Sequence, residues 1–222
     1  MMPWLAQAIV LLSVTAFVHV AAMALAAHSI GIPVRKVSFG TGAAIWERGK
    51  VRIGWFLLGG YVRMKDSRAE LLSDSELADA FDHAPVWKQI AVPVAGAGSV
   101  LLMAMLALGH EGAEAFFGAF RQLFIGAVSP FSDAQAYLRA GKDFASSHSS
   151  IAYAGLLCAK GAAFNLLPML GLNGLHILLP LIRGKHPRKW EDTVVRWTLL
   201  PMLFLMGSWL LAIGVFTFVG MK

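Results

Sequence analysis

The chain has 222 residues, of which 57% are hydrophobic and only 14% are charged, with a mean hydropathy of +0.64. A soluble domain of this length carries about 25% charged residues, so the composition excludes an ordinary soluble domain and indicates an integral membrane protein. The single cysteine, Cys158, excludes an internal disulfide and a cysteine-based metal site. The net charge of +6 comes from basic residues that flank apolar segments, so we expect contact with lipid headgroups and no binding of nucleic acid.

Four segments are long and apolar enough to cross a hydrocarbon core of about 30 Å, which takes about 20 helical residues. They cover approximately residues 3–27, 86–109, 151–181 and 194–221. The first is predicted to be a retained helix rather than a cleaved signal peptide, because no basic stretch precedes it. The third contains Pro168, Gly171 and Gly174, so we expect an irregular stretch surrounded by protein within it. The predicted fold class is therefore mainly α: a polytopic membrane protein in which residues 1–222 form a single membrane domain.

The connections between these segments differ in charge and pattern. Residues 28–88 hold nine of the 19 Lys and Arg, residues 183–196 hold five, and residues 110–150 hold three. The positive-inside rule therefore predicts cytoplasmic basic loops and places both termini outside. Residues 37–65 mix glycine with β-favouring residues, which predicts a membrane-associated β-hairpin.

Two further connections are predicted to be helical. Residues 73–82 are predicted to form a cytoplasmic acidic helix, with Ser73 and Glu76 at the spacing of a capping box. We expect this helix to present a solvated face, with a docking surface as the alternative. Residues 110–150 are amphipathic and are expected to lie along the outer surface.

Several short motifs follow one another in a fixed order along the chain. They include VHVAAM at residues 18–23, GIPV at 31–34, LGGYVRM at 58–64, AG at 95–96 and NLLPMLGLNGLH at 165–176. This series resembles the bacterial site-2 protease family, intramembrane zinc metalloproteases that release anti-sigma factors and related membrane substrates. The resemblance covers nearly the whole chain and implies four transmembrane helices in the bacterial inner membrane. The connection at 110–150 is too short for the PDZ domain that this branch often carries there.

The resemblance also assigns residues that contact a substrate or a partner. In this family a membrane-embedded β-hairpin follows the first core helix and helps to present the substrate. The stretch Gly59, Gly60 and Tyr61 matches the end of that hairpin, and Asn165 and Pro168 match the second active-site motif. We therefore expect these five residues to face a substrate or a partner.

The motifs that hold the metal in this family are incomplete here. In HExxH, two histidines one helical turn apart bind zinc and the glutamate is the general base. His19 matches the first histidine, but Val20 stands at the glutamate and Met23 at the second histidine. In the second motif, NxxPxxxxDG, Asn173 stands at the aspartate. The family pattern AGPxxN in the second helix is also altered, since residues 97 and 100 are alanine and valine.

Each replacement removes a separate function. Valine cannot transfer a proton, methionine offers a soft thioether that suits zinc poorly, and asparagine lacks the charge that offsets a cation. A catalytic zinc site uses three protein ligands and a water, and of the expected three only His19 remains. None of the four apolar segments contains Asp or Glu. We therefore expect no catalytic residue, no metal ligand set and no cofactor; a soft metal on His19 and Met23 is a less favoured interpretation than packing.

Three polar residues in the third segment, Lys160, Asn173 and His176, are candidates for a structural polar site. A buried amide or imidazole in lipid must find a hydrogen-bond partner. Lys160 is an ionisable residue within a span, and two interpretations of it stay open. Its ammonium could fill polar space near Asn165 or Asn173, or the side chain could snorkel toward the outer surface.

The sequence thus favours a pseudoprotease, a site-2 protease homologue that acts as a membrane scaffold, adaptor or subunit and binds another transmembrane protein of unidentified kind. The first alternative is an active zinc-dependent intramembrane protease with substituted ligands. The second is a small transport or permeation element, suggested by Lys160 and the broken third segment.

Overall fold

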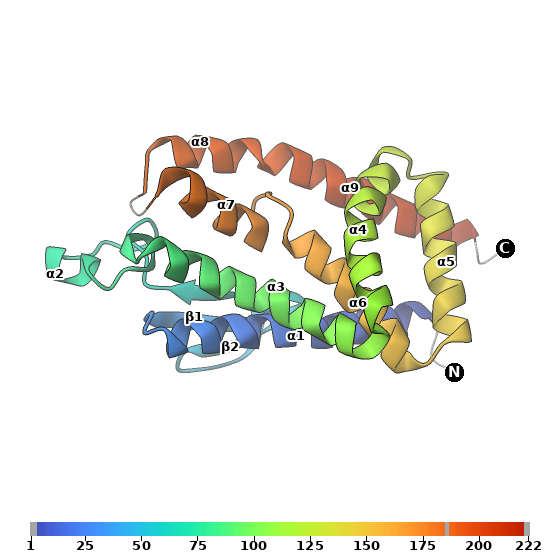
Figure 1. Ribbon diagram of the computed structural model, residues 1–222, viewed down its shortest axis with the longest axis horizontal. Coiled ribbons are helices and arrows are strands. Elements are labelled where there is room, and N and C mark those ends of the chain that lie inside the picture. Colours follow the sequence, from blue (N-terminus) through green and yellow to red (C-terminus); the bar gives the residue numbers. More distant parts are fainter. Residues whose placement is uncertain (1–3, 185–186, 220–222) are drawn as a thin grey trace.

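The computed structural model describes residues 4–184 and 187–219, and this part of the chain is mainly helical, which confirms the predicted fold class at that level. Figure 1 shows α1, α3 and α9 along the long axis, while α4 and α5 lie side by side across it. In chain order the elements are α1 (Trp4–Ser29), β1 (Val34–Arg48), β2 (Val51–Met64), α2 (Asp74–Leu77), the 3-10 turn η1 (Phe81–His83), α3 (Val86–Leu108), α4 (His110–Val128), α5 (Asp133–Ser147), α6 (Ser150–Asn165), α7 (Asn173–Arg183), α8 (Trp190–Trp197) and α9 (Leu199–Val219).

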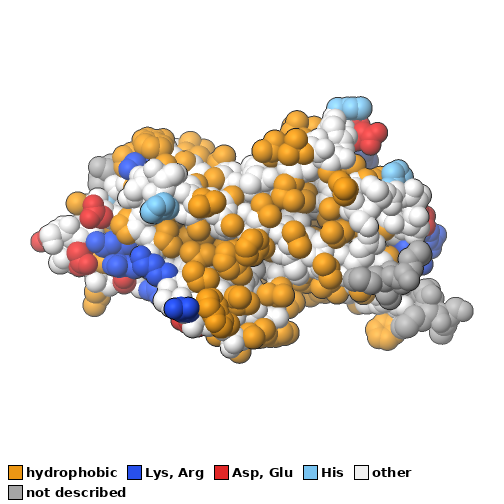
Figure 2. All heavy atoms as spheres, turned by 90° about the horizontal axis from the view of Figure 1, so that it is seen from below, with side chains coloured by type: hydrophobic (Ala, Val, Ile, Leu, Met, Phe, Trp, Pro, Cys, Tyr) orange, Lys and Arg blue, Asp and Glu red, His pale blue; other side chains and the backbone are white. Residues whose placement is uncertain are grey.

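Three described helices are long and apolar enough to cross a membrane: Trp4–Ser29, Val86–Leu108 and Trp190–Phe218, which joins α8 to α9. Large apolar side chains on these helices are widely exposed, for example Leu106 at 79% and Phe218 at 72%. Figure 2 shows hydrophobic side chains over the middle of one face and a group of charged side chains at one end. An exposed apolar surface this extensive is characteristic of contact with lipid or protein.

The third predicted span, 151–181, consists of two helices, α6 and α7, with an irregular stretch between them. α6 ends at Asn165, α7 begins at Asn173, and neither half alone has the length of a span. The irregular stretch expected there is confirmed as residues 166–172, where Pro168 lacks a backbone N–H and Gly171 adopts φ = 80°. The stretch lies inside the protein, because its apolar residues form a cluster with α4 and α9; the buried members are Ala127, Leu167, Met169, Leu172 and Leu205.

The hairpin extends over residues 34–64, close to the predicted 37–65, and its two strands are antiparallel and strongly bent. Residues 37–39 pair with 60–62 on one side and with 51–53 on the other. The bend brings backbones together at Gly54, where an added Cβ would lie 2.3 Å from the carbonyl oxygen of Thr41. Ser38 is fully buried and Phe39 stacks on Phe17 of α1, with ring centroids 4.4 Å apart. These contacts hold the hairpin along the side of α1.

The predicted acidic helix is much shorter than 73–82. The helix covers only Asp74–Leu77, with Glu76 accepting a hydrogen bond from the Ser73 N–H at 3.1 Å as its capping-box spacing predicts. It ends because the next residues turn inward: the Phe81 N–H donates to the Lys65 carbonyl at 2.7 Å. Asp82 is 0% exposed and accepts a hydrogen bond from the Ser67 N–H. The expectation that the acidic side chains of this segment lie on a solvated face is therefore wrong for Asp82.

The connection at 110–150 consists of two helices, and α4 is part of the core. Phe116 and Ala119 pack against Val100 and Ala104 of α3 and against Cys158 of α6. Part of the amphipathic pattern predicted for residues 110–150 is therefore directed toward protein. Phe116 and Ala119 are covered by α3 and α6, whereas Phe117 and Phe124 are 70% and 48% exposed.

Candidate functional site

A cavity of about 680 Å³ lies between α1, β2, the end of α6 and the start of α7. Most residues selected from the sequence line it. They are His19, Val20, Met23, Gly59, Gly60, Tyr61, Asn165, Asn173 and His176. The structure thus brings the family's two motifs and the end of the hairpin into one place. Pro168 and Lys160 are not among the lining residues.

The centre of the cavity is a contact between α1 and α7. Asn173, the first residue of α7, places its Nδ2 atom 3.1 Å from His19 Nε2 and 3.7 Å from Met23 Sδ. The same amide group donates to the backbone carbonyl of Pro93 in α3 at 2.9 Å. The amide nitrogen carries two hydrogens: one is donated to this carbonyl, and the other is directed toward the imidazole. Two altered motif positions, Met23 and Asn173, therefore meet beside the retained His19.

A glycine of α3 makes this close approach possible. A Cβ added at Gly96 would lie 2.6 Å from Met23 Cγ and 2.8 Å from His19 Cε1. No side chain larger than hydrogen fits there unless the Met23 and His19 side chains move. His19 is 9% exposed, and its Nδ1 has no hydrogen-bond partner among residues 4–184 and 187–219. The imidazole is therefore held by packing and by the Asn173 contact.

The position of the expected general base is filled by an apolar side chain. Val20 is 1% exposed, and its Cγ2 would lie 2.8 Å from a Cβ added at Gly60 of β2. Val20 thus joins α1 to the hairpin by close packing. Tyr61, the next residue of the strand, is 39% exposed and its hydroxyl accepts a hydrogen bond from Arg52 at 3.3 Å.

One acidic residue, Asp66, lines the cavity within the described part of the chain. Arg68 holds its carboxylate with two hydrogen bonds, from Nε at 2.9 Å and from Nη2 at 2.6 Å. Burial alone would raise the pKa of Asp66, but the hydrogen bonds and charge of Arg68 outweigh it and hold that pKa below its usual range. Asp66 is therefore an ion-paired carboxylate and not a proton acceptor with a raised pKa.

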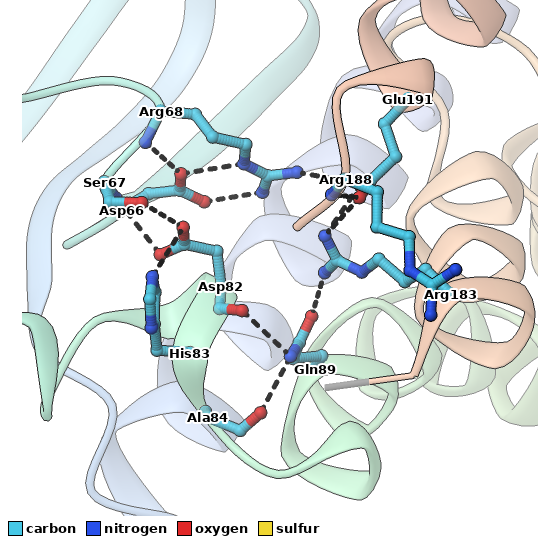
Figure 3. Close-up of polar contacts among 10 residues, drawn as sticks. All are labelled: Asp66, Ser67, Arg68, Asp82, His83, Ala84, Gln89, Arg183, Arg188 and Glu191. Atoms are coloured by element: carbon cyan, nitrogen blue, oxygen red, sulfur yellow. Dashed lines mark hydrogen bonds and ion pairs between the residues drawn. The ribbon is translucent and has the colours of Figure 1, made fainter. Parts of the chain in front are cut away.

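Asp66 and Arg68 belong to a polar cluster at one end of the cavity that sequence reasoning did not identify (Figure 3). Arg183 at the end of α7 donates from Nη1 to both carboxylate oxygens of Glu191 in α8, at 2.9 and 2.7 Å. Arg183 also donates to Gln89 of α3, and Arg68 Nη1 lies 3.6 Å from Glu191. The cluster joins α3, α7, α8 and the segment after the hairpin. Its only signal in the sequence is that Arg183 and Glu191 lie at the borders of apolar segments.

Lys160 lies apart from Asn173 and His176. Its ammonium donates to Gln122 Oε1 of α4, and it lines a second cavity of about 250 Å³. The interpretation that placed this charge beside Asn165 or Asn173 is therefore wrong, because the helix directs residue 160 to another face. Within the expected polar site, Asn173 and His176 share the first cavity and Lys160 does not.

The residues at the centre of the first cavity do not fit a zinc ion. The donor set is one imidazole, one thioether and one amide, and the Asn173 amide nitrogen lies against the Nε2 atom with which His19 would bind a metal. Zinc in proteins is bound by thiolate, imidazole and carboxylate groups. Among residues 4–184 and 187–219, no group of three His, Cys, Asp or Glu side chains has the arrangement of a metal site.

Comparison with known proteins agrees with the motifs and the fold. The model of Peptidase family M50, the site-2 proteases, matches residues 7–207. This chain belongs to that family.

Two proteins named "Putative zinc metalloprotease" are similar to the chain. The one from Xylella fastidiosa strain Temecula1 is 37% identical over 87 residues, which are 37% of this chain and 20% of the relative. The one from Vibrio cholerae is 37% identical over 75 residues, or 32% and 17% of the two chains. The "Regulator of sigma E protease" of Haemophilus influenzae is 32% identical over 104 residues, or 45% and 24%. The matched regions thus cover less than a quarter of these relatives.

Proposed function

We propose that this chain is a catalytically inactive site-2 protease homologue that acts as a membrane scaffold and binds a transmembrane segment of another protein. The observation that carries the proposal is the contact of Asn173 with His19 and Met23, 3.1 and 3.7 Å away. The imidazole, thioether and neutral amide that meet there are not the set of three protein ligands that a catalytic zinc needs. The buried Val20 removes the general base as well.

The shape of the first cavity supports the binding part of the proposal. It is about 680 Å³ in volume, and it is bordered by the end of the hairpin and by the irregular stretch before α7. The adjoining strand carries exposed apolar side chains, with Trp55 at 62% and Phe56 at 44%. A partner helix could therefore contact the hairpin while part of it enters the cavity. We further propose that residues 151–181 together make the fourth crossing, with both basic loops in the cytoplasm.

Metal content separates the proposed function from an active protease. The chain is purified gently from native membranes without added metal, and zinc per chain is measured by elemental analysis. We expect a zinc content near zero and no chelator-sensitive cleavage of a membrane peptide. About one zinc per chain that disappears in His19→Ala would refute the inactive assignment and favour the protease.

Partner binding is tested with a matched pair of glycine substitutions. A Cβ at Gly59 meets only Thr41 Cγ2 at 3.8 Å, so Gly59→Leu should fill the cavity without disturbing the hairpin. Gly98, on the exposed side of α3, also meets open space and is the control. We expect one protein to co-purify at fixed stoichiometry with the wild type and with Gly98→Leu, and to be lost with Gly59→Leu. Equal recovery with both variants would exclude the cavity as the partner site.

A further inference from the structure

A second cavity, separate from the family's motifs, lies between α1, α4, α5, α6 and α9. Its volume is about 250 Å³ and most of its lining is apolar. On α6 the lining residues are Tyr153, Leu156, Leu157 and Lys160, which follow one another at helical spacing and so share one face. Trp4 and Trp209 contribute aromatic rings from the first and last helices.

Among the described residues of this lining, Lys160 is the one cationic group and no acidic side chain balances its charge. Its Nζ donates to the neutral Gln122 Oε1, none of the ion pairs among the described residues includes it, and the lining contains no Asp or Glu. A charge in apolar surroundings is costly unless it is paired. A lysine ammonium has three donors, so two remain for another group.

Two tyrosines add polar groups to the same cavity. Tyr153 is only 2% exposed, and Tyr137 lines the cavity from α5. Neither hydroxyl forms a hydrogen bond with any described residue. One ammonium in a mostly apolar cavity that also includes two tyrosines suits a small anionic group with an apolar body.

We propose that this cavity binds a fatty acid, a single-chain carboxylic acid, with its carboxylate at Lys160 and its chain among the apolar residues. One negative charge balances the single ammonium, whereas a phosphate monoester, with about −1.5 to −2 charges at pH 7, would leave an excess in apolar surroundings. The volume of about 250 Å³ lies below the range of about 300–1,000 Å³ for pockets that hold drug-sized ligands. It therefore suits one chain and not the two chains of a membrane lipid.

The experiment measures radiolabelled dodecanoate retained by the protein in phosphatidylcholine nanodiscs, relative to empty nanodiscs. We expect saturable binding of one dodecanoate per chain, at least tenfold weaker in Lys160→Met. Lys142→Met, at an exposed position of α5 outside the cavity, is the matched control and should bind like the wild type. Unlabelled dodecanol and dodecyl phosphate should each compete at least tenfold less well than dodecanoate.

A second variant keeps the charge and removes the space. Gly141 lines the cavity and an added Cβ there meets nothing within 4 Å, so Gly141→Leu should fill the cavity and abolish binding while the melting temperature stays within a few degrees. The proposal is overturned by retention no greater than in empty nanodiscs, by equal binding in Lys160→Met, or by undiminished binding in Gly141→Leu. Competition by dodecyl phosphate as strong as that by dodecanoate would overturn the assignment of a carboxylate.

Discussion

Removal of the Glu191 charge is predicted to destabilise the fold strongly, because the Arg183 guanidinium that it balances is buried. The two side chains are 4% and 1% exposed, with N–O distances of 2.9 and 2.7 Å. Breaking a buried pair by removal of one partner costs about 3–5 kcal/mol, since the remaining charge is left uncompensated. We therefore expect Glu191→Gln to lower the free energy of unfolding by about this amount, and Arg183→Met to lower it by less, because Arg68 Nη1 still lies 3.6 Å from Glu191.

The paired replacement tests the reasoning behind that magnitude. Arg183→Met combined with Glu191→Leu removes both charges, and such apolar replacements are often neutral. Gln89 would lose a hydrogen bond from Arg183, and the Arg188 N–H would lose its acceptor on Glu191; each loss typically costs about 1 kcal/mol. The double variant should therefore be more stable than Glu191→Gln and within about 2 kcal/mol of the wild type.

The assay is equilibrium unfolding by SDS in mixed micelles, followed by the fluorescence of the seven tryptophans. Lys36 and Glu47 provide a control, because their N–O distance is also 2.7 Å but their side chains are 29% and 44% exposed. Glu47→Gln should cause no measurable change. A cost below 1 kcal/mol for both buried single variants, or a double variant whose cost equals their sum, would refute the uncompensated-charge argument.

Three other predictions follow from the first cavity and its polar end. Restoring the family residues together, as Val20→Glu, Met23→His and Asn173→Asp, should give about one bound zinc per chain by elemental analysis; a variant that folds and binds none would show that more than these ligands is missing. Gly96→Val should lower stability by about 1–3 kcal/mol, the usual cost of overpacking, because its Cβ meets Met23 and His19; an unchanged SDS midpoint would contradict the close contact. Because the pKa of Asp66 lies below its ordinary 3.8 in the folded protein, its pairing should stabilise the fold above about pH 3.8 and lose that effect as the pH falls through the lowered value. Melting curves of Asp66→Asn and wild type should therefore converge in acid, and a constant difference down to pH 2 would argue against the lowered pKa.

The local patterns of the sequence predicted much of the fold. Runs of apolar residues located α1, α3 and α9, and the glycine-rich β-favouring stretch located the hairpin to within three residues. Pro168 and Gly171 indicated the break before α7, since one lacks an N–H and the other tolerates a positive φ. The family's motifs located His19, Met23 and Asn173, which the structure brings into contact.

Features that depend on tertiary contacts were beyond such patterns. Asp82 follows a capped acidic helix, and the helix does not reach it because Phe81 bonds to the Lys65 carbonyl and Asp82 is buried against Ser67. Arg183 and Glu191 look like ordinary charges at the ends of spans until the fold places them beside Gln89. The contact of Lys160 with Gln122 depends on how α6 is oriented relative to α4. Residue spacing within one helix does not reveal which neighbouring helix each face contacts.

The start of α7 within the membrane domain has an electrostatic consequence for the first cavity. The first N–H groups of a helix lack partners within the helix, and its N-terminus carries about half a positive charge. Leu172 and Asn173, at that terminus, border the cavity beside His19. A carboxylate at position 173 would balance this field, whereas the neutral amide leaves it positive. The replacement by asparagine therefore changes the preference of the cavity as well as its ligands: electron-rich groups, such as the carbonyl oxygens of a locally unwound helix, are favoured there over a cation.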